Sequence, residues 1–319
     1  TVVRAELKVY RDLNENPLFE RVDCPVCGKS DFRSTFTITY GELRQKPSLD
    51  YSNIGVGPET LFNIDECSEC RLVLVNPRIK PVHQDLPYNE SKRNQWQDVD
   101  EEVGPEVDKA ALRRRRLGYL PVLQRLIALS GNGSDLSLLD VGSGYGHTLV
   151  LAREFGIDGC GIEIDRARLA YCRQAGLEVW QPGEFDSKFP DRKFDILVAQ
   201  SILEHAVDLS AFMRFVSSKA RDDAVLFVSG LTPEVIRRER RTKRFVRAHF
   251  IEHINFTPVR TMDFLMRRYG FQPIKKHVVL LNAKTIQVPG IAFRLAKALM
   301  RIRNTGTASR YYRFVGTRV

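Results

Sequence analysis

The chain has 319 residues and a formal net charge of +10, and 43% of its residues are hydrophobic and 28% charged. This composition is that of ordinary globular domains and excludes a disordered or collagen-like chain. At about 150 residues per domain, the length predicts two domains.

Neither a membrane span nor a secretion signal is expected. The longest apolar runs stay far below the ~20 residues that cross a bilayer. The first eight residues mix charged and apolar side chains and lack the apolar stretch of a signal peptide. We therefore expect a cytoplasmic protein.

Four cysteines in the N-terminal part form two pairs, Cys24 with Cys27 and Cys67 with Cys70, each with two residues between the thiols. This spacing lets both sulfurs of a tight turn reach one metal ion, and two such turns complete the tetrahedral shell of a structural zinc ion. A pair of disulfides or a redox couple is the alternative. A filled shell would leave zinc no open position for chemistry.

The segments around the cysteines predict a small β domain. Residues 34–40 alternate polar and apolar side chains, and 71–78 read as a strand that ends at a proline. A polar connection then runs to about residue 106. We therefore expect a zinc-binding domain at 1–106 and a second domain at 107–319.

The second domain alternates helices and strands. Leucines at spacings of three to four residues predict a first helix over 107–129. Strands are expected at 137–141, 159–163, 178–180, 195–199, 225–229, 274–281 and 312–316, and helices at 147–155, 165–174, 209–221 and 261–269. This order predicts an α/β fold with a doubly wound, mainly parallel sheet, which binds ligands beyond the carboxyl ends of its central strands.

The loop after the first of these strands contains Gly142, Gly144 and Gly146. Such a turn brings bare backbone close to a nucleotide-like ligand. The dinucleotide fingerprint needs glycine where His147 stands, and no P-loop lysine follows, so the loop favours a nucleoside without a phosphate chain. Glu163, at the end of the second strand, is placed to accept hydrogen bonds from both ribose hydroxyls.

Three stretches, 138–146, 161–165 and 194–205, together resemble the class I S-adenosylmethionine-dependent methyltransferases. The resemblance covers 136–319 and implies a Rossmann-like, seven-stranded sheet that ends in an antiparallel strand pair. It also implies S-adenosylmethionine as the cofactor, held by the glycine loop, the acid after the second strand and residues after the third and fourth strands. The matching positions are Asp140, Gly142, Ser143, Gly144, Gly146, Glu163, Ile164, Glu184 or its neighbour Phe185, and Gln200.

The cysteine segment ahead of this domain is similar to that of bacterial methyltransferases that are linked to sugars and cell-surface glycans. Some of those, the deoxysugar C-methyltransferases, have a further domain after the methyltransferase core, where this sequence stops. The resemblance therefore favours O-methylation of a sugar, glycan or other small anionic acceptor. Sugar C-methylation stays an alternative.

Two histidines are candidates for the base. Methyl transfer to a hydroxyl needs an aligned acceptor and a group that takes the proton. A neutral imidazole, with a reference pKa of ~6.5, can do so near neutrality. His205 follows the fourth strand, and His253 precedes the helix expected at 261–269. A hydrogen-bonded histidine that shapes the pocket is the alternative for each, and Glu204 is expected to be a charge at a helix start.

The positive charge lies in the last third, where residues 231–319 hold 20 Lys and Arg and four acidic residues. Such a field attracts anions. Residues 232–250 predict a mobile basic lid, which would present Arg240, Arg241 and Arg244 to an anionic acceptor. Residues 289–303 predict a basic amphipathic helix, which would pack on its own core or a second subunit, or lie on the acidic inner face of a membrane.

Nucleic acid is the main competing partner. The basic last third and a zinc module would suit RNA through phosphate contacts. Enzymes that methylate the exocyclic amines of bases have an Asn-Pro-Pro-Tyr type tetrapeptide after the fourth strand, where residues 200–203 here read Gln-Ser-Ile-Leu. The Pro-Cys pair that attacks cytosine is also missing. An RNA methyltransferase or a non-catalytic nucleic-acid-binding module is therefore the second hypothesis.

Overall fold

The computed structural model describes residues 8–43, 51–83, 116–131, 135–242, 245, 250–274 and 311–318. The chain divides into two compact units, each made of three segments. The first unit comprises Thr1–Val107, Leu203–Met213 and Gly230–Leu265, and the second comprises Asp108–Ile202, Arg214–Ser229 and Met266–Val319. Two segments that the sequence analysis assigned to the second domain thus belong to the same compact unit as the cysteines.

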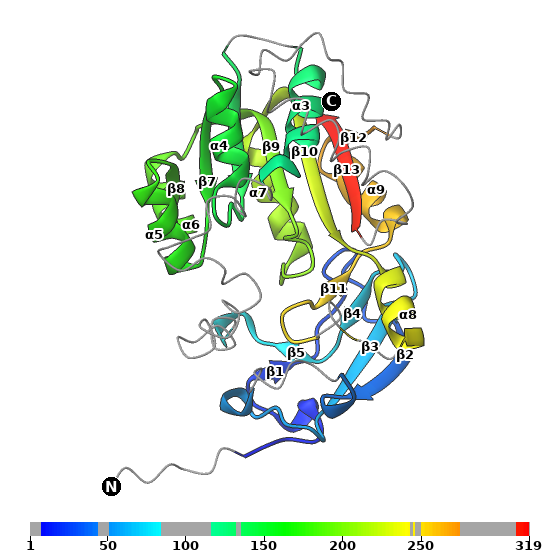
Figure 1. The fold of residues 1–319 in the computed structure, drawn as a ribbon. Helices are drawn as coiled ribbons and strands as arrows, with labels where there is room; N and C mark the ends of the chain where they lie inside the picture. The colour runs from blue at the N-terminus through cyan, green and yellow to red at the C-terminus, as the bar shows by residue number, and fades with distance from the viewer. Residues whose placement is uncertain are drawn as a thin grey trace, which may run out of the picture. The chain divides into compact units, whose positions relative to one another are not determined.

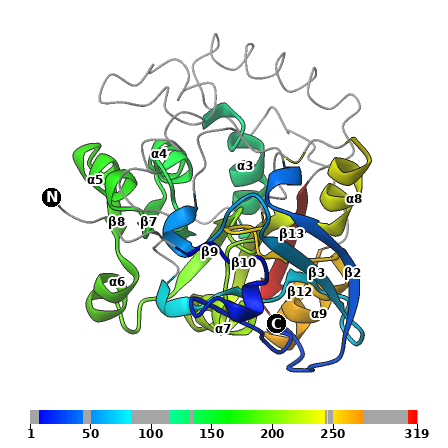
Figure 2. The same ribbon diagram turned by 90° about the horizontal axis from the view of Figure 1, so that it is seen from below.

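The first unit is built on a four-stranded sheet with the order β11-β4-β3-β2 in the described part of the chain (Figure 1). The strands are β2 (Phe32–Thr39), β3 (Leu61–Cys67), β4 (Val73–Val75) and β11 (Asn255–Phe256), and each pairs antiparallel with its neighbour. Figure 2 shows the longest two, β2 and β3, side by side. A separate ribbon pairs β1 (Phe19–Glu20) with β5 (Arg78–Ile79). The strand expected at 71–78 is therefore divided into β4 and β5.

Short helical elements complete this unit. They are α8 (Pro233–Thr242) and 3-10 turns at Leu13–Glu15, Gly41–Leu43, Ser52–Ile54 and Pro81–His83. Aromatic rings from two segments form its core, with ring centroids 6.4 Å apart for Phe62 and Phe250 and 5.8 Å apart for Phe250 and Phe256. Because Phe62 lies on β3 while Phe250 and Phe256 come nearly 190 residues later, the N-terminal strands need the later segment to cover their apolar face.

The second unit contains a seven-stranded sheet, among the described residues, with the order β12-β13-β10-β9-β6-β7-β8 (Figure 1). Five strands run parallel: β6 (Ser137–Val141), β7 (Asp158–Ile162), β8 (Glu178–Trp180), β9 (Phe194–Gln200) and β10 (Ala220–Leu231). The last two, β12 (Phe271–Pro273) and β13 (Tyr311–Arg318), pair antiparallel. The carboxyl ends of β6 and β7 consequently lie next to each other.

The helices of the second unit are α3 (Leu120–Leu129), α4 (His147–Glu154), α5 (Arg166–Gln174) and α6 (Pro182–Lys188). Two more, α7 (Leu209–Lys219) and α9 (Val259–Arg268), are divided between the two units. Alternate residues of the strands face α3, α4 and α5, as a period of two requires. On β9 these are Ile196 and Val198, and on β10 they are Val225 and Phe227. None of the helices in the described ranges has both the length and the apolar character needed to span a membrane.

The expected elements of the second domain are present where they fall on described residues, and the main differences are as follows. The helix expected over 107–129 has α3 as its last part, which starts beside Pro121 because proline fits only the first turn of a helix. Helix α6 was missed. The last strand pair uses 271–273 instead of 274–281, of which only Ile274 is described. The helix expected at 289–303 lies outside the described residues.

Candidate functional site

The loop between β6 and α4 contains three glycines in the left-handed backbone region, with φ of 72° at Gly142, 55° at Gly144 and 69° at Gly146. Side chains with a Cβ rarely adopt this conformation. A Cβ at Gly142 would also collide with Ile202, and one at Gly146 with Leu177, whereas one at Gly144 would meet nothing within 4 Å. The outer glycines therefore fix the turn, and the middle one borders open space.

Glu163 is joined directly to this loop. The residue is 5% exposed, and its carboxylate accepts hydrogen bonds from the backbone N–H of Gly144 at 2.7 Å and of Asp165 at 2.8 Å, one on each oxygen. A carboxylate oxygen has two lone pairs, so each oxygen keeps one for a ribose hydroxyl. The structure thus brings together the two regions that the sequence assigned to one cofactor.

The other residues predicted to bind the cofactor lie at or next to the carboxyl ends of β6, β7 and β9. Burial raises the pKa of Asp140 to about 7, and a hydrogen bond from Thr148 offsets part of this effect because it lowers the pKa. Ser143 Oγ is buried and has no hydrogen-bond partner among the described residues. A buried unsatisfied hydroxyl costs about 1–3 kcal/mol, so a polar ligand group would be favoured here. Ile164 is 70% exposed and offers an apolar surface beside Glu163, and Gln200 ends β9, half-buried.

The two residues that were expected to meet the cofactor after the third strand, Glu184 and Phe185, both stabilise the fold around α6. Glu184 accepts hydrogen bonds from the backbone N–H of Gln181 at 3.1 Å and from Arg173 at 2.6 Å, and these hold the pKa of its carboxyl below the usual range. It therefore caps α6. Phe185 is fully buried and packs on Phe194. Its ring thus belongs to the core, and a contact between Phe185 and a cofactor stays a prediction.

We predict that Glu163→Gln weakens binding of S-adenosylmethionine, the cofactor expected from the sequence. A hydrogen bond to a charged group contributes about 1.5–3 kcal/mol, so Kd should rise about 10–100-fold. Isothermal titration calorimetry measures this change. Glu178→Gln, an exposed acid on β8, is the matched control. An unchanged Kd for Glu163→Gln would remove Glu163 from the cofactor site.

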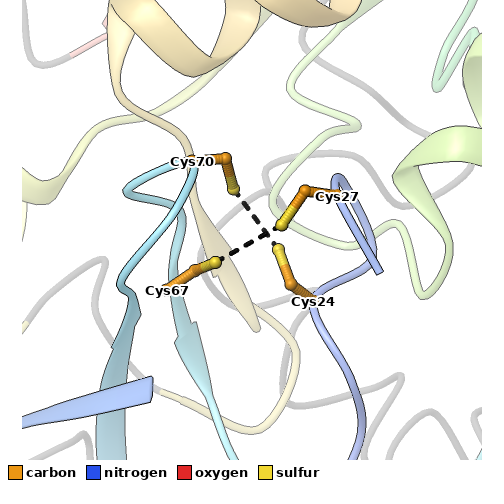
Figure 3. Close-up of side chains that lie close together, drawn as sticks. All are labelled: Cys24, Cys27, Cys67 and Cys70. Atoms are coloured by element: carbon orange, nitrogen blue, oxygen red, sulfur yellow. Dashed lines mark hydrogen bonds between the residues drawn. The ribbon is translucent and has the colours of Figure 1, made fainter. Parts of the chain in front are cut away.

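The four paired cysteines converge in the first unit (Figure 3). The Sγ atoms of Cys24 and Cys70 are 3.4 Å apart and those of Cys27 and Cys67 are 3.5 Å apart, and all four sulfurs lie within 4.8 Å of one another. Bonds of ~2.3 Å from a tetrahedral zinc ion place sulfurs about 3.8 Å apart, so the spacing fits this ion. All six cysteines fall within the described residues and are free thiols, which excludes the disulfide alternative for this structure.

The two cysteine turns share one backbone conformation. Gly28 N–H donates to Cys24 O at 2.8 Å, and Arg71 N–H donates to Cys67 O at 3.0 Å. Both donors are left-handed, with φ of 72° for Gly28 and 69° for Arg71. A hydrogen bond from Cys70 lowers the pKa of Cys24 to about 5, while burial raises the pKa of Cys27 to about 11. A cation between the sulfurs would stabilise all four as thiolates.

A second cluster in the same unit contains both histidines named from the sequence. The ring centroids of His205 and His253 are 4.6 Å apart, with the rings inclined at 68°. Glu204, which is only 1% exposed, joins them, so that one ligand atom from each of the three residues lies within 4.8 Å of the others. Glu204 was expected to be a charge at a helix start, which is wrong because it is buried and α7 begins only at Leu209.

Asn255 holds the backbone of this cluster in place, and the sequence analysis missed it. Its side-chain N–H groups donate to Leu203 O at 3.1 Å and to Ala206 O at 2.5 Å. Ile254 N–H also donates to Glu204 O at 2.8 Å. These bonds connect residues about 50 positions apart, so the segments that carry His205 and His253 are cross-linked.

The cysteine turns are tied to the same two segments. Ser210 Oγ–H donates to Pro25 O at 2.9 Å, inside the first turn, and Thr261 Oγ–H donates to Cys70 O at 2.6 Å, at the end of the second. The buried Arg78 donates to Val207 O at 2.6 Å. The cysteine cluster and the histidine pair are therefore parts of one packed body.

The predicted lid is helical in its first half. Of residues 232–250, positions 233–242 form α8, which buries Val235 and Ile236. Arg240 and Arg241 are exposed, and the guanidinium of Arg240 lies 4.8 Å from the ring centroid of Phe36. Arg244 lies outside the described residues.

A family model of methyltransferase domains matches residues 110–276. No curated protein matches the sequence.

Several solved methyltransferases are similar to the chain at low identity. An S-adenosylmethionine-dependent methyltransferase from Archaeoglobus fulgidus is 17% identical, with 63% of this chain and 94% of that chain covered and a TM-score of 0.44. Magnesium protoporphyrin IX methyltransferase from Synechocystis PCC 6803, solved with bound S-adenosylhomocysteine, is 14% identical, with coverages of 75% and 99% and a TM-score of 0.48. A methyltransferase from Mesorhizobium loti is 16% identical, with coverages of 63% and 97% and a TM-score of 0.44.

The family model spans more than half of the chain and includes both the glycine loop and Glu163. The chain therefore belongs to the methyltransferase domain family and is an S-adenosylmethionine-dependent methyltransferase.

Proposed function

We propose that this enzyme methylates a hydroxyl of a sugar, a glycan or another small anionic acceptor, with His205 or His253 as the base. The observation that carries the proposal is the pairing of the two imidazoles, 4.6 Å apart, beside the buried carboxylate of Glu204. Two imidazoles next to one carboxylate can take up a proton, because the carboxylate stabilises the imidazolium that forms.

Besides a base, methyl transfer needs from the protein only an aligned acceptor and the exclusion of water. As the acceptor oxygen bonds to the methyl carbon, the bond from that carbon to sulfur breaks and the hydroxyl proton moves to an imidazole nitrogen. The sulfonium is a strong electrophile, so the protein's task is to align the acceptor and exclude water. Neither a metal ion nor a covalent intermediate is needed for these steps.

The anionic character of the acceptor is supported by α8. Its exposed side chains include Arg237, Arg238, Arg240 and Arg241, and the one acid among its exposed residues, Glu234, pairs with Arg237 at 3.4 Å. Planar guanidinium groups favour phosphates and carboxylates. We therefore propose a diphosphate-linked or carboxylate-bearing acceptor. Contact of residues 289–303 with an acidic membrane stays a prediction.

We also propose that Cys24, Cys27, Cys67 and Cys70 hold a structural zinc ion. The donor set, the spacing of the sulfurs and the matched turns support this assignment. Four thiolates fill a tetrahedral shell, so this ion would stabilise the first unit and would bind neither cofactor nor acceptor.

The test is mass spectrometry of polar, lipid and RNA extracts of the source organism after incubation with the enzyme and S-adenosylmethionine. We expect a polar or lipid product that is heavier by one methylene group. NMR of that product separates an O-methyl from a C-methyl group. Methylation confined to RNA would overturn the proposed acceptor class in favour of the nucleic-acid hypothesis.

With the acceptor found, the two histidines can be tested separately. Replacing the residue that acts as the base by asparagine should lower kcat by about 10²–10⁴ without changing the Kd of S-adenosylmethionine. His83→Asn is the matched control, since His83 lies in the same unit outside the cluster. If both His205→Asn and His253→Asn keep kcat within a few-fold, neither residue is the base.

A further inference from the structure

The cluster of Glu204, His205 and His253 has the composition of a metal site. One carboxylate oxygen and one nitrogen of each imidazole lie within 4.8 Å of one another. An ion with bonds of about 2.0–2.2 Å places neighbouring ligand atoms about 3–4 Å apart. Small rotations of the imidazole rings would therefore bring all three atoms onto one ion. We infer that these residues form a binding site for a divalent transition-metal ion, separate from the four cysteines.

The ligand types decide which ions fit. Two imidazoles and one carboxylate suit Zn²⁺, Ni²⁺, Co²⁺ and Fe²⁺, whereas Mg²⁺ and Ca²⁺ prefer oxygen ligands alone. Three protein ligands also leave coordination positions open. The four-cysteine cluster differs in both respects, because its ligands are all thiolates and its shell is full. The two sites therefore differ in the type of their ligand atoms and in the number of coordination positions that stay open.

The surroundings of the cluster hold it ready for an ion. Glu204 as a whole residue is 1% exposed, and its backbone oxygen accepts hydrogen bonds from Ile254 N–H at 2.8 Å and Asn255 N–H at 3.2 Å. Asn255 in turn holds the backbone on both sides of Glu204 and His205. Since two cross-linked segments supply the ligands, little conformational freedom is left to lose on binding.

Occupancy of this site has a consequence for catalysis, and this step rests on the proposed function. An imidazole nitrogen binds a metal ion with the same lone pair with which it accepts a proton. A bound ion therefore removes the base. Ni²⁺ should inhibit methyl transfer, and a chelator such as EDTA should restore it.

The site is tested by titrating the full chain, with zinc in its cysteine cluster, with NiCl₂ in a calorimeter. We expect one Ni²⁺ per chain, with unchanged zinc content afterwards. Glu204→Gln and His253→Ala should each weaken Ni²⁺ binding by about 10–100-fold or more, whereas His83→Ala should not. Retained zinc and retained cofactor binding would show that each variant is folded.

A second readout needs no variant. Ni²⁺ is paramagnetic, so in the wild-type protein it should broaden the imidazole proton signals of His205 and His253 before that of His83. Equal Ni²⁺ affinity in wild type and in the double variant His205→Ala/His253→Ala, or no Ni²⁺ binding to the wild type, would overturn the inference.

The activity measurement is read separately from the binding measurement. Ni²⁺ that binds at the histidines and leaves kcat unchanged would refute the base assignment while the metal site stands. Turnover that depends on His205 or His253, in a protein that binds no Ni²⁺, would refute the metal site while the proposed function stands.

Discussion

Gly144→Arg is expected to abolish binding of S-adenosylmethionine. A Cβ at Gly144 meets nothing within 4 Å, so an arginine side chain would fill the open space beside the loop and block the cofactor instead of disturbing the core. The left-handed φ of 55° adds a strain of about 1–2 kcal/mol. We expect Kd to rise more than about 100-fold, which corresponds to about 2.7 kcal/mol and is measurable by calorimetry.

Gly176→Arg is the matched control for this variant. Gly176 is exposed, has a φ of 69° and borders open space, but it lies in the turn after α5. An arginine there carries a similar backbone strain at a position outside the glycine loop. The two variants should lose similar thermal stability while only Gly144→Arg loses the cofactor. Equal cofactor affinity in both would place the cofactor elsewhere.

Cys67→Ser is expected to abolish binding of the proposed zinc ion and to unfold the first unit. Structural zinc contributes about 10–16 kcal/mol on binding, which is comparable with the ~5–15 kcal/mol of the total stability of a typical domain. Metal analysis should give one zinc per wild-type chain and far less in the variant. Near-ultraviolet circular dichroism should show the aromatic core around Phe62 and Phe250 lost.

A cysteine outside the cluster provides the comparison. Cys160 is buried on β7 in the second unit, and burial raises the pKa of its thiol to about 12. Cys160→Ala should keep a full zinc content and cost only about 1–2 kcal/mol, the effect of a smaller core side chain. Less than about half an equivalent of zinc per chain in the purified wild-type protein would refute the zinc assignment.

Local patterns were enough to predict most of the second unit. Buried parallel strands are short apolar runs between glycine-containing turns, so β6 and β8 have the limits expected from the sequence. The glycine loop and Glu163 were also predictable, because left-handed turns restrict residue type and the two loops follow neighbouring strands. These signals all act over a few residues.

What the sequence did not reveal depends on contacts between distant residues. Glu204 was expected to be a charge at a helix start, but it is 1% exposed, and the N–H groups of residues 254 and 255 donate to its backbone oxygen. Phe185 lies one position from a plausible cofactor contact, and only the packing of α6 turns its ring into the core. Helix α6 itself is short, with the glycine at position 183 in its first turn, so its propensity is weak.

The pairing of β11 with β4 also sets an order of events during synthesis. Phe256 pairs with Val73, and about 180 residues separate the two. At about 5–20 residues per second, a ribosome needs roughly 10–40 s to make that stretch. Throughout this interval one edge of β4 is unpaired, and the aromatic rings of the N-terminal strands are not yet packed against Phe250 and Phe256. Open edges and bare apolar faces attract other chains. The nascent chain should therefore be a chaperone client until the segment with His253 emerges.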